Sequence, residues 1–209
     1  MAKIGLIDYG MGNLFSVQQA FKRVDQPLEI ICDQKTLRSC DALILPGVGS
    51  FDPAMINLKK TDLIPSIINW VNNGKPLLGI CLGLQLLFES SDEGTSKGLG
   101  VIKGYIRRLP SEKNERIPHI GWSPIHKINK CPILENYPDS SWMYFVHSYS
   151  ACPLEETNTV ATTKFGETDV SSVVWHKNTC ACQFHPEKSG IAGEKLILNW
   201  VDWLKKNKF

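Results

Sequence analysis

The sequence has no apolar run approaching the ~18 consecutive residues that a membrane-spanning helix needs, so we expect no such helix. It also lacks a strong charge of either sign, since its 209 residues carry a formal net charge of +2. This balance gives no electrostatic reason to expect nucleic acid or an anionic membrane as a partner. Residues 1–8 reach an acidic side chain too early for a signal peptide, and we expect them to contain a strand.

Cysteine is present, but not in the pattern of a secreted disulfide framework. There are seven cysteines, an odd number at irregular spacing. This usage fits a reducing, cytoplasmic location, where most thiols are small buried apolar groups and one can be reactive. The sequence also has no internal repeat, low-complexity segment or dividing linker. Its length and ordinary apolar fraction suit one sizeable core, so we expect residues 1–209 to form a single domain.

Apolar periodicity differs between the two halves of the chain. The first half alternates strand patterns with helical ones, at 3–8, 14–24, 28–31, 42–45, 63–71 and 76–80. The second half contains short β-like runs, then a strand and a closing helix, at 105–109, 123–128, 142–146, 160–163, 173–176, 180–184 and 197–204. We therefore predict an α/β fold in which a mostly parallel sheet, covered by helices on both faces, gains an antiparallel portion.

A pentapeptide after the strand at 76–80 carries the strongest local signal for catalysis. Gly79-Ile80-Cys81-Leu82-Gly83 has the pattern of a nucleophile elbow, with cysteine in place of the more common serine. The tight strand-to-helix turn strains the nucleophile's backbone, and the flanking glycines make room for it. Cys81 would project from the carboxyl end of the sheet, where a helix N-terminus favours the thiolate and the Leu82 N–H can bind an oxyanion. A buried core thiol is the alternative.

A second motif supplies what a cysteine nucleophile needs. Gln183-Phe184-His185-Pro186-Glu187 follows the strand predicted near the chain end. Positions i and i+2 of an extended backbone point the same way, so Glu187 can lie beside His185. His185 can then take the thiol proton while Glu187 fixes its tautomer and balances its charge. The alternative, a surface His-Pro turn, is disfavoured by the elbow in the same chain.

Two glycine-containing loops also follow predicted strands. Pro46-Gly47-Val48-Gly49-Ser50-Phe51 can aim backbone N–H groups at a ligand, and we assign it to the other wall of the oxyanion hole. A phosphate-binding loop is the alternative, but no Gly-Lys-Ser/Thr follows, as a Walker motif requires. Gly10-Met11-Gly12-Asn13-Leu14-Phe15 begins like a dinucleotide-binding loop, but Phe15 stands in place of the third glycine.

A zinc site is a further alternative, because His176, Cys180, Cys182 and His185 lie close together in sequence. Strand alternation places the two cysteines on one face and His185 on the other. A single tetrahedral site could not easily use both faces, so we expect no metal.

Taken together, these motifs resemble those of the class I, triad-type glutamine amidotransferases. The resemblance covers essentially the whole chain and is strongest to the glutaminase subunits of imidazole glycerol phosphate synthase. It implies a flavodoxin-like α/β fold. Three positions depart from the family's usual residues: Ser123, Ala181 and Cys182. The matching segments are 7–14, 46–51, 79–85, 118–122, 144–149 and 183–189.

The resemblance also implies a reaction and the residues that perform it. Cys81 would attack the side-chain amide of glutamine, His185 would protonate the departing ammonia, and water would hydrolyse the glutamyl thioester. Glu187 would orient His185, and no cofactor is implied. By position, the oxyanion donors would be Leu82, Val48 and Gly49, and the residues that hold glutamine would be Gly49, Gln85, Ser148 and Tyr149.

A partner is implied in the same way. The ammonia would pass, within a heterodimer, to a (β/α)₈-barrel cyclase that makes imidazole glycerol phosphate and an aminoimidazole carboxamide ribotide in histidine biosynthesis. The interface residues would be Asn13, Trp122, Tyr144 and Lys188. The alternative roles of these residues are a helix cap for Asn13, core aromatics for Trp122 and Tyr144, and a solvated side chain for Lys188.

Two other functions stay open at the level of sequence. A stand-alone thiol amidohydrolase of the same fold would need no partner, although Gln85 and residues 147–149 suit free glutamine. A non-enzymatic binding subunit would not need Cys81, His185 and Glu187 together, and the sequence retains all three.

Overall fold

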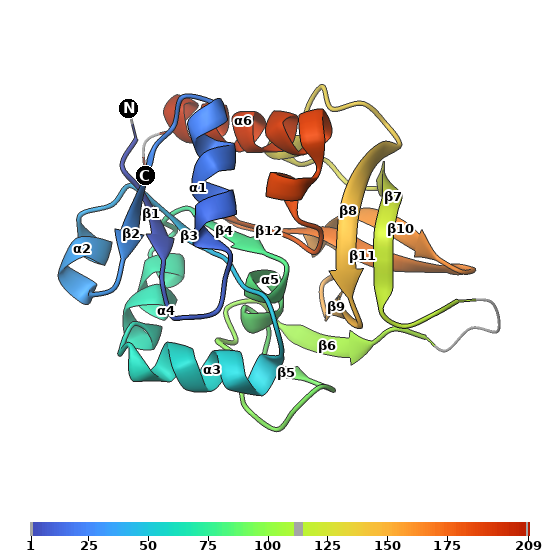
Figure 1. The fold of residues 1–209 in the computed structure, drawn as a ribbon, viewed down its shortest axis with the longest axis horizontal. Helices are drawn as coiled ribbons and strands as arrows, with labels where there is room; N and C mark the ends of the chain where they lie inside the picture. The colour runs from blue at the N-terminus through green and yellow to red at the C-terminus, as the bar shows by residue number, and fades with distance from the viewer. Residues whose placement is uncertain (1, 111–114, 208) are drawn as a thin grey trace.

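The computed structural model describes residues 2–110, 115–207 and 209. Within this part of the chain, one large sheet dominates (Figure 1), and five of its nine strands are parallel. In sheet order the parallel strands are β2 (Leu28–Ile31), β1 (Ile4–Ile7), β3 (Ala42–Leu45), β4 (Leu77–Ile80) and β12 (Thr179–Cys182). This order, with a switch between β1 and β3, is that of flavodoxin-like folds.

The sheet continues beyond β12 with antiparallel strands. In order they are β11 (Thr168–His176), β10 (Thr159–Phe165), β7 (His119–Lys127) and β8 (Ser141–His147). A smaller sheet combines β5 (Ser90–Ser91), β6 (Gly104–Arg108) and β9 (Tyr149–Pro153). The α/β class with a mostly parallel sheet and an added antiparallel portion is therefore confirmed.

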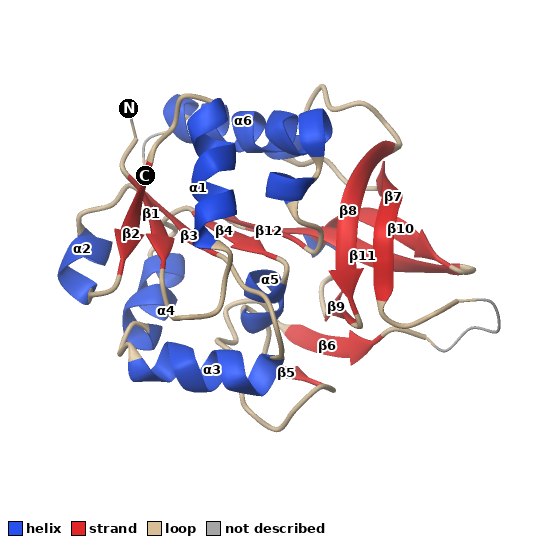
Figure 2. Ribbon diagram, viewed as in Figure 1, coloured by secondary structure: helices blue, strands red, loops and turns tan. Residues whose placement is uncertain are grey.

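Helices cover both faces of the parallel strands (Figure 2). On one face lie α1 (Leu14–Arg23) and α6 (Gly190–Lys206), and the other face is covered by α2 (Gln34–Arg38), α3 (Phe51–Lys60), α4 (Ile64–Asn72) and α5 (Leu82–Leu86). Short 3₁₀ turns occur at Pro132–Leu134, Glu156–Asn158 and Pro186–Lys188. None of the helices in the described residues has the length and apolar character needed to cross a bilayer.

Two large apolar clusters, one on each face of the sheet, form the core. On the α1 and α6 face, the fully buried rings of Phe21 and Trp200 meet edge to face, with centroids 6.0 Å apart. Arg23 of α1 also forms an ion pair with Glu194 of α6. Because a parallel strand buries both faces, β1, β3 and β4 are entirely apolar or glycine, as their sequences predict.

Most predicted elements are confirmed, some with shifted ends. The strands at 28–31 and 42–45 have the predicted bounds, and α4 carries Pro65 in its first turn and Gly74, at φ +71°, just past its end. The predicted strand at 180–184 was wrong at its end, because β12 stops at Cys182. The strand predicted at 173–176 is the end of the longer β11, and the one predicted at 123–128 overlaps the longer β7, which stops at Lys127. Helices α2 and α3 and strand β9 were not predicted.

Candidate active site

Cys81 occupies the sharp turn between β4 and α5. Its φ of 53° and ψ of −111° lie in a region that side chains rarely adopt, as the elbow motif predicted. Glycine is required beside it, because a Cβ on Gly83 would lie 1.9 Å from the backbone oxygen of Leu45. A Cβ on Gly79 would meet three atoms at 3.1 Å. The close approach of β3 to the turn therefore explains the glycine at position 83.

The neighbouring strand carries the histidine to the same edge of the sheet. β12 pairs with β4 so that Cys182 lies opposite Ile80, and the Cys81 N–H donates to the Cys182 carbonyl at 2.8 Å. Three residues later comes His185, 2% exposed. Its Nδ1 lies 2.7 Å from Oε1 of Glu187, and that side chain is also buried. The predicted pair thus forms, but through the 3₁₀ turn that begins at Pro186, not through an extended strand.

Electrostatics favour a charged imidazole at this position. Burial alone would lower the pKa of His185, but its interactions with Cys81 and Glu187 outweigh burial and raise the pKa to about 10. Nδ1 faces the carboxylate, whereas Nε2 is buried and makes no hydrogen bond with any described residue. Nε2 is therefore the nitrogen that is free to exchange a proton with Cys81 or a substrate.

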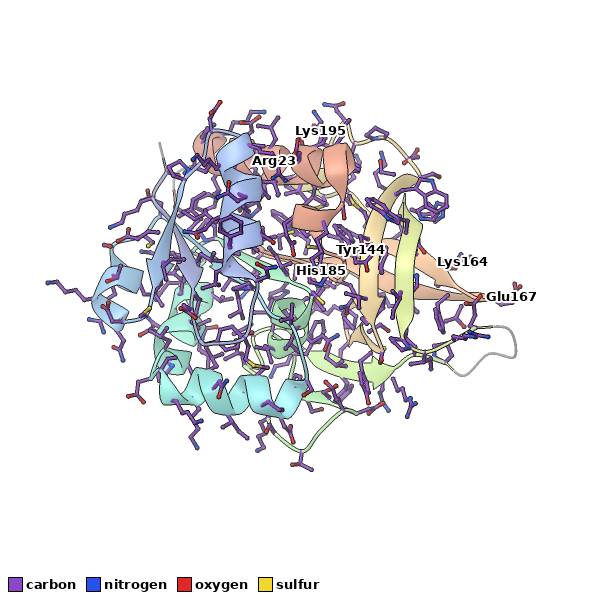
Figure 3. The ribbon with its side chains drawn as sticks, viewed as in Figure 1. Arg23, Tyr144, Lys164, Glu167, His185 and Lys195 are labelled. Carbon is purple, nitrogen blue, oxygen red and sulfur yellow. The ribbon has the colours of Figure 1, made fainter. Side chains whose placement is uncertain are left out.

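Backbone contacts hold His185 against β8. The His185 N–H donates to the Tyr144 carbonyl at 3.0 Å. The hydroxyl of the buried Ser189 donates to the His185 carbonyl at 2.6 Å and accepts from the Tyr144 N–H at 3.0 Å. Figure 3 labels Tyr144 on β8 and His185 beside it. These three hydrogen bonds hold His185 against Tyr144 of β8.

The predicted catalytic, oxyanion and substrate residues line one pocket of about 280 Å³, except Glu187, which contacts His185 and does not line it. A larger groove of about 950 Å³ runs between residues 127–136 and the end of α6, but none of the predicted site residues lines it. The smaller pocket has the size for an amino acid and contains the chemistry, so we take it as the site. Its lining is Val48, Gly49, Cys81, Leu82, Gln85, Glu93, Pro118, Val146, His147, Ser148, Tyr149 and His185.

The loop after β3 forms one wall of this pocket. The buried Tyr9 hydroxyl donates to the Pro46 carbonyl at 2.8 Å. A Cβ on Gly47 would lie 2.6 Å from that hydroxyl and 2.8 Å from the Leu82 Cβ, so only glycine lets the loop approach the elbow. Gly49 has a φ of +101°, which glycine adopts at little cost. Leu82 begins α5, so its N–H has no partner in the preceding turn of the helix.

Comparison with known proteins places this site in a family. Residues 6–202 match the class-I glutamine amidotransferase family. The chain belongs to this family. It is 82% identical, over the full length of both chains, to imidazole glycerol phosphate synthase subunit HisH of Prochlorococcus marinus strain NATL2A. It is 60% identical to the HisH of Prochlorococcus marinus strain MIT 9211, over 96% of this chain and 94% of that one.

A solved structure supports the amidotransferase fold independently. A crystal structure titled as a glutamine amidotransferase superposes with a TM-score of 0.76 over 97% of this chain and 98% of its own. At 18% identity, this likeness concerns the fold alone.

Three residues around the amidotransferase pocket were given no individual role from the sequence. Glu93 lines the pocket, and its Oε2 accepts the N–H of Phe51 at 2.8 Å, at the start of α3. His147 also lines it, and Gln183 approaches the Cys81 sulfur. His147 and Gln183 belong to motifs that carry the resemblance. Each is a polar residue beside apolar ones, and this pattern could have indicated a role in the site. Glu93 had no local signal.

His147 belongs to a hydrogen-bonded chain whose direction is fixed. Its Nδ1 lies 2.9 Å from the Tyr149 carbonyl, which can only accept, so Nδ1 carries the proton and Nε2 accepts. Nδ1 of His119 donates to that Nε2 at 3.2 Å, and Nε2 of His119 accepts from the Ser123 hydroxyl at 2.9 Å. These donor and acceptor assignments are those of neutral rings, the state that burial favours. Burial lowers the pKa of His147 to about 4 and also lowers that of His119.

The residues predicted to contact a partner come from β7, from β8, from the start of α1 and from the turn before α6. Trp122 is 50% exposed and packs edge to face on the half-buried Tyr144, with centroids 5.9 Å apart. Lys188 is exposed. Asn13 caps α1, since its side chain accepts the Ser16 N–H at 3.1 Å. Trp122 is thus no core aromatic, and Asn13 does serve as a helix cap.

The cysteines considered as zinc ligands lie in the core. Cys180 and Cys182 are fully buried on the α1 and α6 face, and Ala181 packs on the opposite face. Burial raises the pKa of both thiols well above the usual value. In the part of the chain that the structure describes, no three His, Cys, Asp or Glu side chains are grouped as metal ligands. The two cysteines instead pack as apolar groups.

Proposed function

We propose that this chain is the glutaminase subunit of imidazole glycerol phosphate synthase. It hydrolyses glutamine to glutamate and ammonia through a thioester on Cys81. The observation that carries the proposal is the meeting of Cys81, with its strained backbone, and the buried His185–Glu187 pair at one pocket. Two HisH subunits among its relatives, at 82% and 60% identity, support the particular reaction.

The chemistry follows from the positions of these groups. The Cys81 sulfur attacks the carboxamide carbon, and the carbonyl oxygen gains the charge. His185 protonates the nitrogen, the C–N bond breaks, and ammonia leaves a glutamyl thioester. His185 then removes a proton from water, which attacks the thioester and releases glutamate and the thiol. Glu187, at 2.7 Å from Nδ1, holds the ring and stabilises its charged form throughout.

Backbone N–H groups would stabilise the oxyanion. We assign this role to Leu82, at the start of α5, and to the Val48–Gly49 segment, because all three residues line the pocket beside Cys81. Tyr9 supports that segment through the Pro46 carbonyl. Residues 146–149 line another part of the pocket. The space between these residues and Cys81 can hold a substrate.

The pocket's polar groups suit the amino-acid end of glutamine. Both N–H groups of Gln85 are used inside the protein, at the Tyr149 carbonyl (3.1 Å) and at Oε1 of Gln183 (3.3 Å). Only the Gln85 carbonyl oxygen remains, so it accepts hydrogen bonds from the substrate. Together with the Glu93 carboxylate it would bind the α-ammonium group. Gly49, Ser148 and Tyr149 would complete the substrate contacts.

A partner subunit fits the exposed face of the β7–β8 hairpin. Register pairs Ile120 with Val146 and Trp122 with Tyr144, so these side chains share one face. Ile120 is 60% exposed, Trp122 50% and Val146 37%, which is unusual for neighbouring large apolar groups. We propose that a (β/α)₈-barrel cyclase covers this hairpin face, with Asn13 and Lys188 at its border, and receives the ammonia.

The hairpin face is also joined to the catalytic residues. Tyr144 holds the His185 backbone at 3.0 Å, so a partner seated on Tyr144 would bear directly on the triad. This connection favours the partner-dependent glutaminase over the stand-alone amidohydrolase. We further propose that residues 1–209 act as one domain, without cofactor or metal, in the cytoplasm.

A paired assay tests the proposal. Glutamate release from glutamine would be measured for the chain alone and with the cyclase and its nucleotide ligand. We expect slow release alone and a clear rise with the partner. Equal rates would favour the stand-alone hydrolase. Trp122→Ser is the matched variant, since it removes an exposed ring from the hairpin face without touching the pocket, and it should lose the rise while keeping the basal rate.

A further inference from the structure

Gln183 places a side-chain amide against the sulfur of Cys81. Its Nε2 lies 3.8 Å from Sγ, within the range of a hydrogen bond to sulfur. The side chain is completely buried, and its backbone is held by β11, since the Gln183 N–H donates to the Ser172 carbonyl at 2.9 Å. A buried amide has a strong need for partners, so its orientation is informative.

The neighbouring groups fix which end of this amide faces the sulfur. The Tyr149 carbonyl can only accept, so Gln85 must present its Nε2 there, at 3.1 Å. The second N–H on the same Nε2 points to Gln183 at 3.3 Å, and only an oxygen can accept it. Gln183 therefore presents Oε1 to Gln85 and Nε2 to Cys81. The orientation follows from a backbone carbonyl and not from a choice of rotamer.

Tyr149 is itself anchored from the other side. Its carbonyl also accepts from Nδ1 of His147 at 2.9 Å. Two donors, His147 of β8 and Gln85 of α5, therefore share the Tyr149 carbonyl oxygen. Together they fix the group that orients Gln85. The Gln85–Gln183 pair has no ionisable member, so it presents the same donor to the sulfur at every pH at which the fold persists.

We propose that Gln183 is the residue that positions the Cys81 sulfur, with Gln85 acting on the sulfur through it. The inference rests on the proposed role of Cys81 as nucleophile. An N–H donor stabilises the thiolate relative to the thiol and restricts the sulfur to one rotamer, so attack begins from a defined position. Gln85 then has two tasks, contact with the substrate and orientation of Gln183.

Alkylation of Cys81 tests this without using glutamine. Wild type and Gln183→Met, which keeps the bulk and removes the donor, would be treated with iodoacetamide across a pH series. The modified Cys81 peptide would be quantified by mass spectrometry, with the exposed Cys32 and Cys152 as internal references. Gln26→Met is the matched control, because Gln26 is 1% exposed and bonded to the Ala2 carbonyl, away from the pocket.

We expect Gln183→Met to move the pH profile of Cys81 alkylation about one unit to higher pH, so that alkylation on the acid side of the profile is about tenfold slower, the effect of one lost bond to a charged group. Gln26→Met should leave the profile in place. Turnover should fall in kcat more than KM rises. A profile unchanged in Gln183→Met would overturn the proposal, because a merely structural glutamine would alter stability and not this profile.

A second variant keeps the test decisive if Gln183→Met does not fold. Gln85→Met leaves Gln183 in place but frees its orientation, so the profile should move in the same direction. The double variant should match Gln183→Met alone, whereas additive shifts would show that Gln85 does not act through Gln183. Failure of the proposed function is recognised separately, since Cys81→Ala would then retain glutaminase activity.

Discussion

His147 makes a testable contribution to the acid stability of the protein. It is 5% exposed and donates from Nδ1 to the Tyr149 carbonyl, while its Nε2 accepts from His119. A proton added to Nε2 would face the N–H of His119 at 3.2 Å, and His185 nearby opposes the charge as well. Replacement by leucine, which removes the titrating group and keeps the bulk, is the perturbation.

The size of the effect follows from the pKa. Burial lowers the pKa of His147 to about 4, against 6.5 for the ordinary side chain. Between these values the unfolded chain binds a proton that the folded chain does not, so folding stability rises with pH in that window. One pH unit is worth about 1.36 kcal/mol, so as the pH falls from about 6.5 to about 4 His147 should remove about 3 kcal/mol of unfolding free energy.

Urea unfolding at pH 7 and pH 4.5 measures this loss. His147→Leu should be less stable than wild type at pH 7 but should lose about 2–3 kcal/mol less on acidification. Met143→Leu is the matched control, since Met143 is fully buried on the same strand as His147 and has no ionisable group, and it should lose as much as wild type. If His147→Leu and wild type lose the same free energy, His147 does not titrate as described.

Two further predictions concern the catalytic turn. Glu187→Gln should lower kcat about 10- to 100-fold, because a charged hydrogen bond to His185 is worth about 1.5–3 kcal/mol, and should leave KM nearly unchanged; steady-state glutaminase kinetics measure this, and a kcat within threefold of wild type would argue against the pair. Gly83→Ala should destabilise the fold by more than about 1–3 kcal/mol, because its Cβ would meet the Leu45 oxygen at 1.9 Å, whereas Gly79→Ala should cost less. Urea unfolding compares the two, and equal stabilities would contradict the packing described.

Local patterns were enough to predict the five parallel strands and to place the candidate catalytic residues at the ends of two of them. The elbow is encoded by consecutive residues, so Cys81 could be placed between a strand and a helix without tertiary information. The His185–Glu187 pair also forms, but Pro186 turns the chain into a 3₁₀ helix where an extended strand was expected. Helix α3 was missed although its buried residues have helical spacing, because it begins directly at the end of the glycine loop.

The site contacts that we did not predict from the sequence join residues that are distant in the chain. His119 and His147 are 28 residues apart and meet only because the register of β7 and β8 places them opposite each other. Gln183 reaches Cys81 across 102 residues, through the pairing of β12 with β4. Local periodicity does not specify which residues of two strands lie opposite each other. Hydrogen-bonded chains of this kind can therefore be identified only in the folded structure.

The most direct test of the account is capture of the covalent intermediate. Enzyme turning over glutamine would be quenched in acid, digested and examined by mass spectrometry for a glutamyl adduct. The adduct should lie on the peptide that contains Cys81 and should be absent, together with glutamate release, in folded Cys81→Ala. A glutamyl adduct on another residue, or glutamate release by Cys81→Ala, would contradict the assignment of Cys81 as the nucleophile.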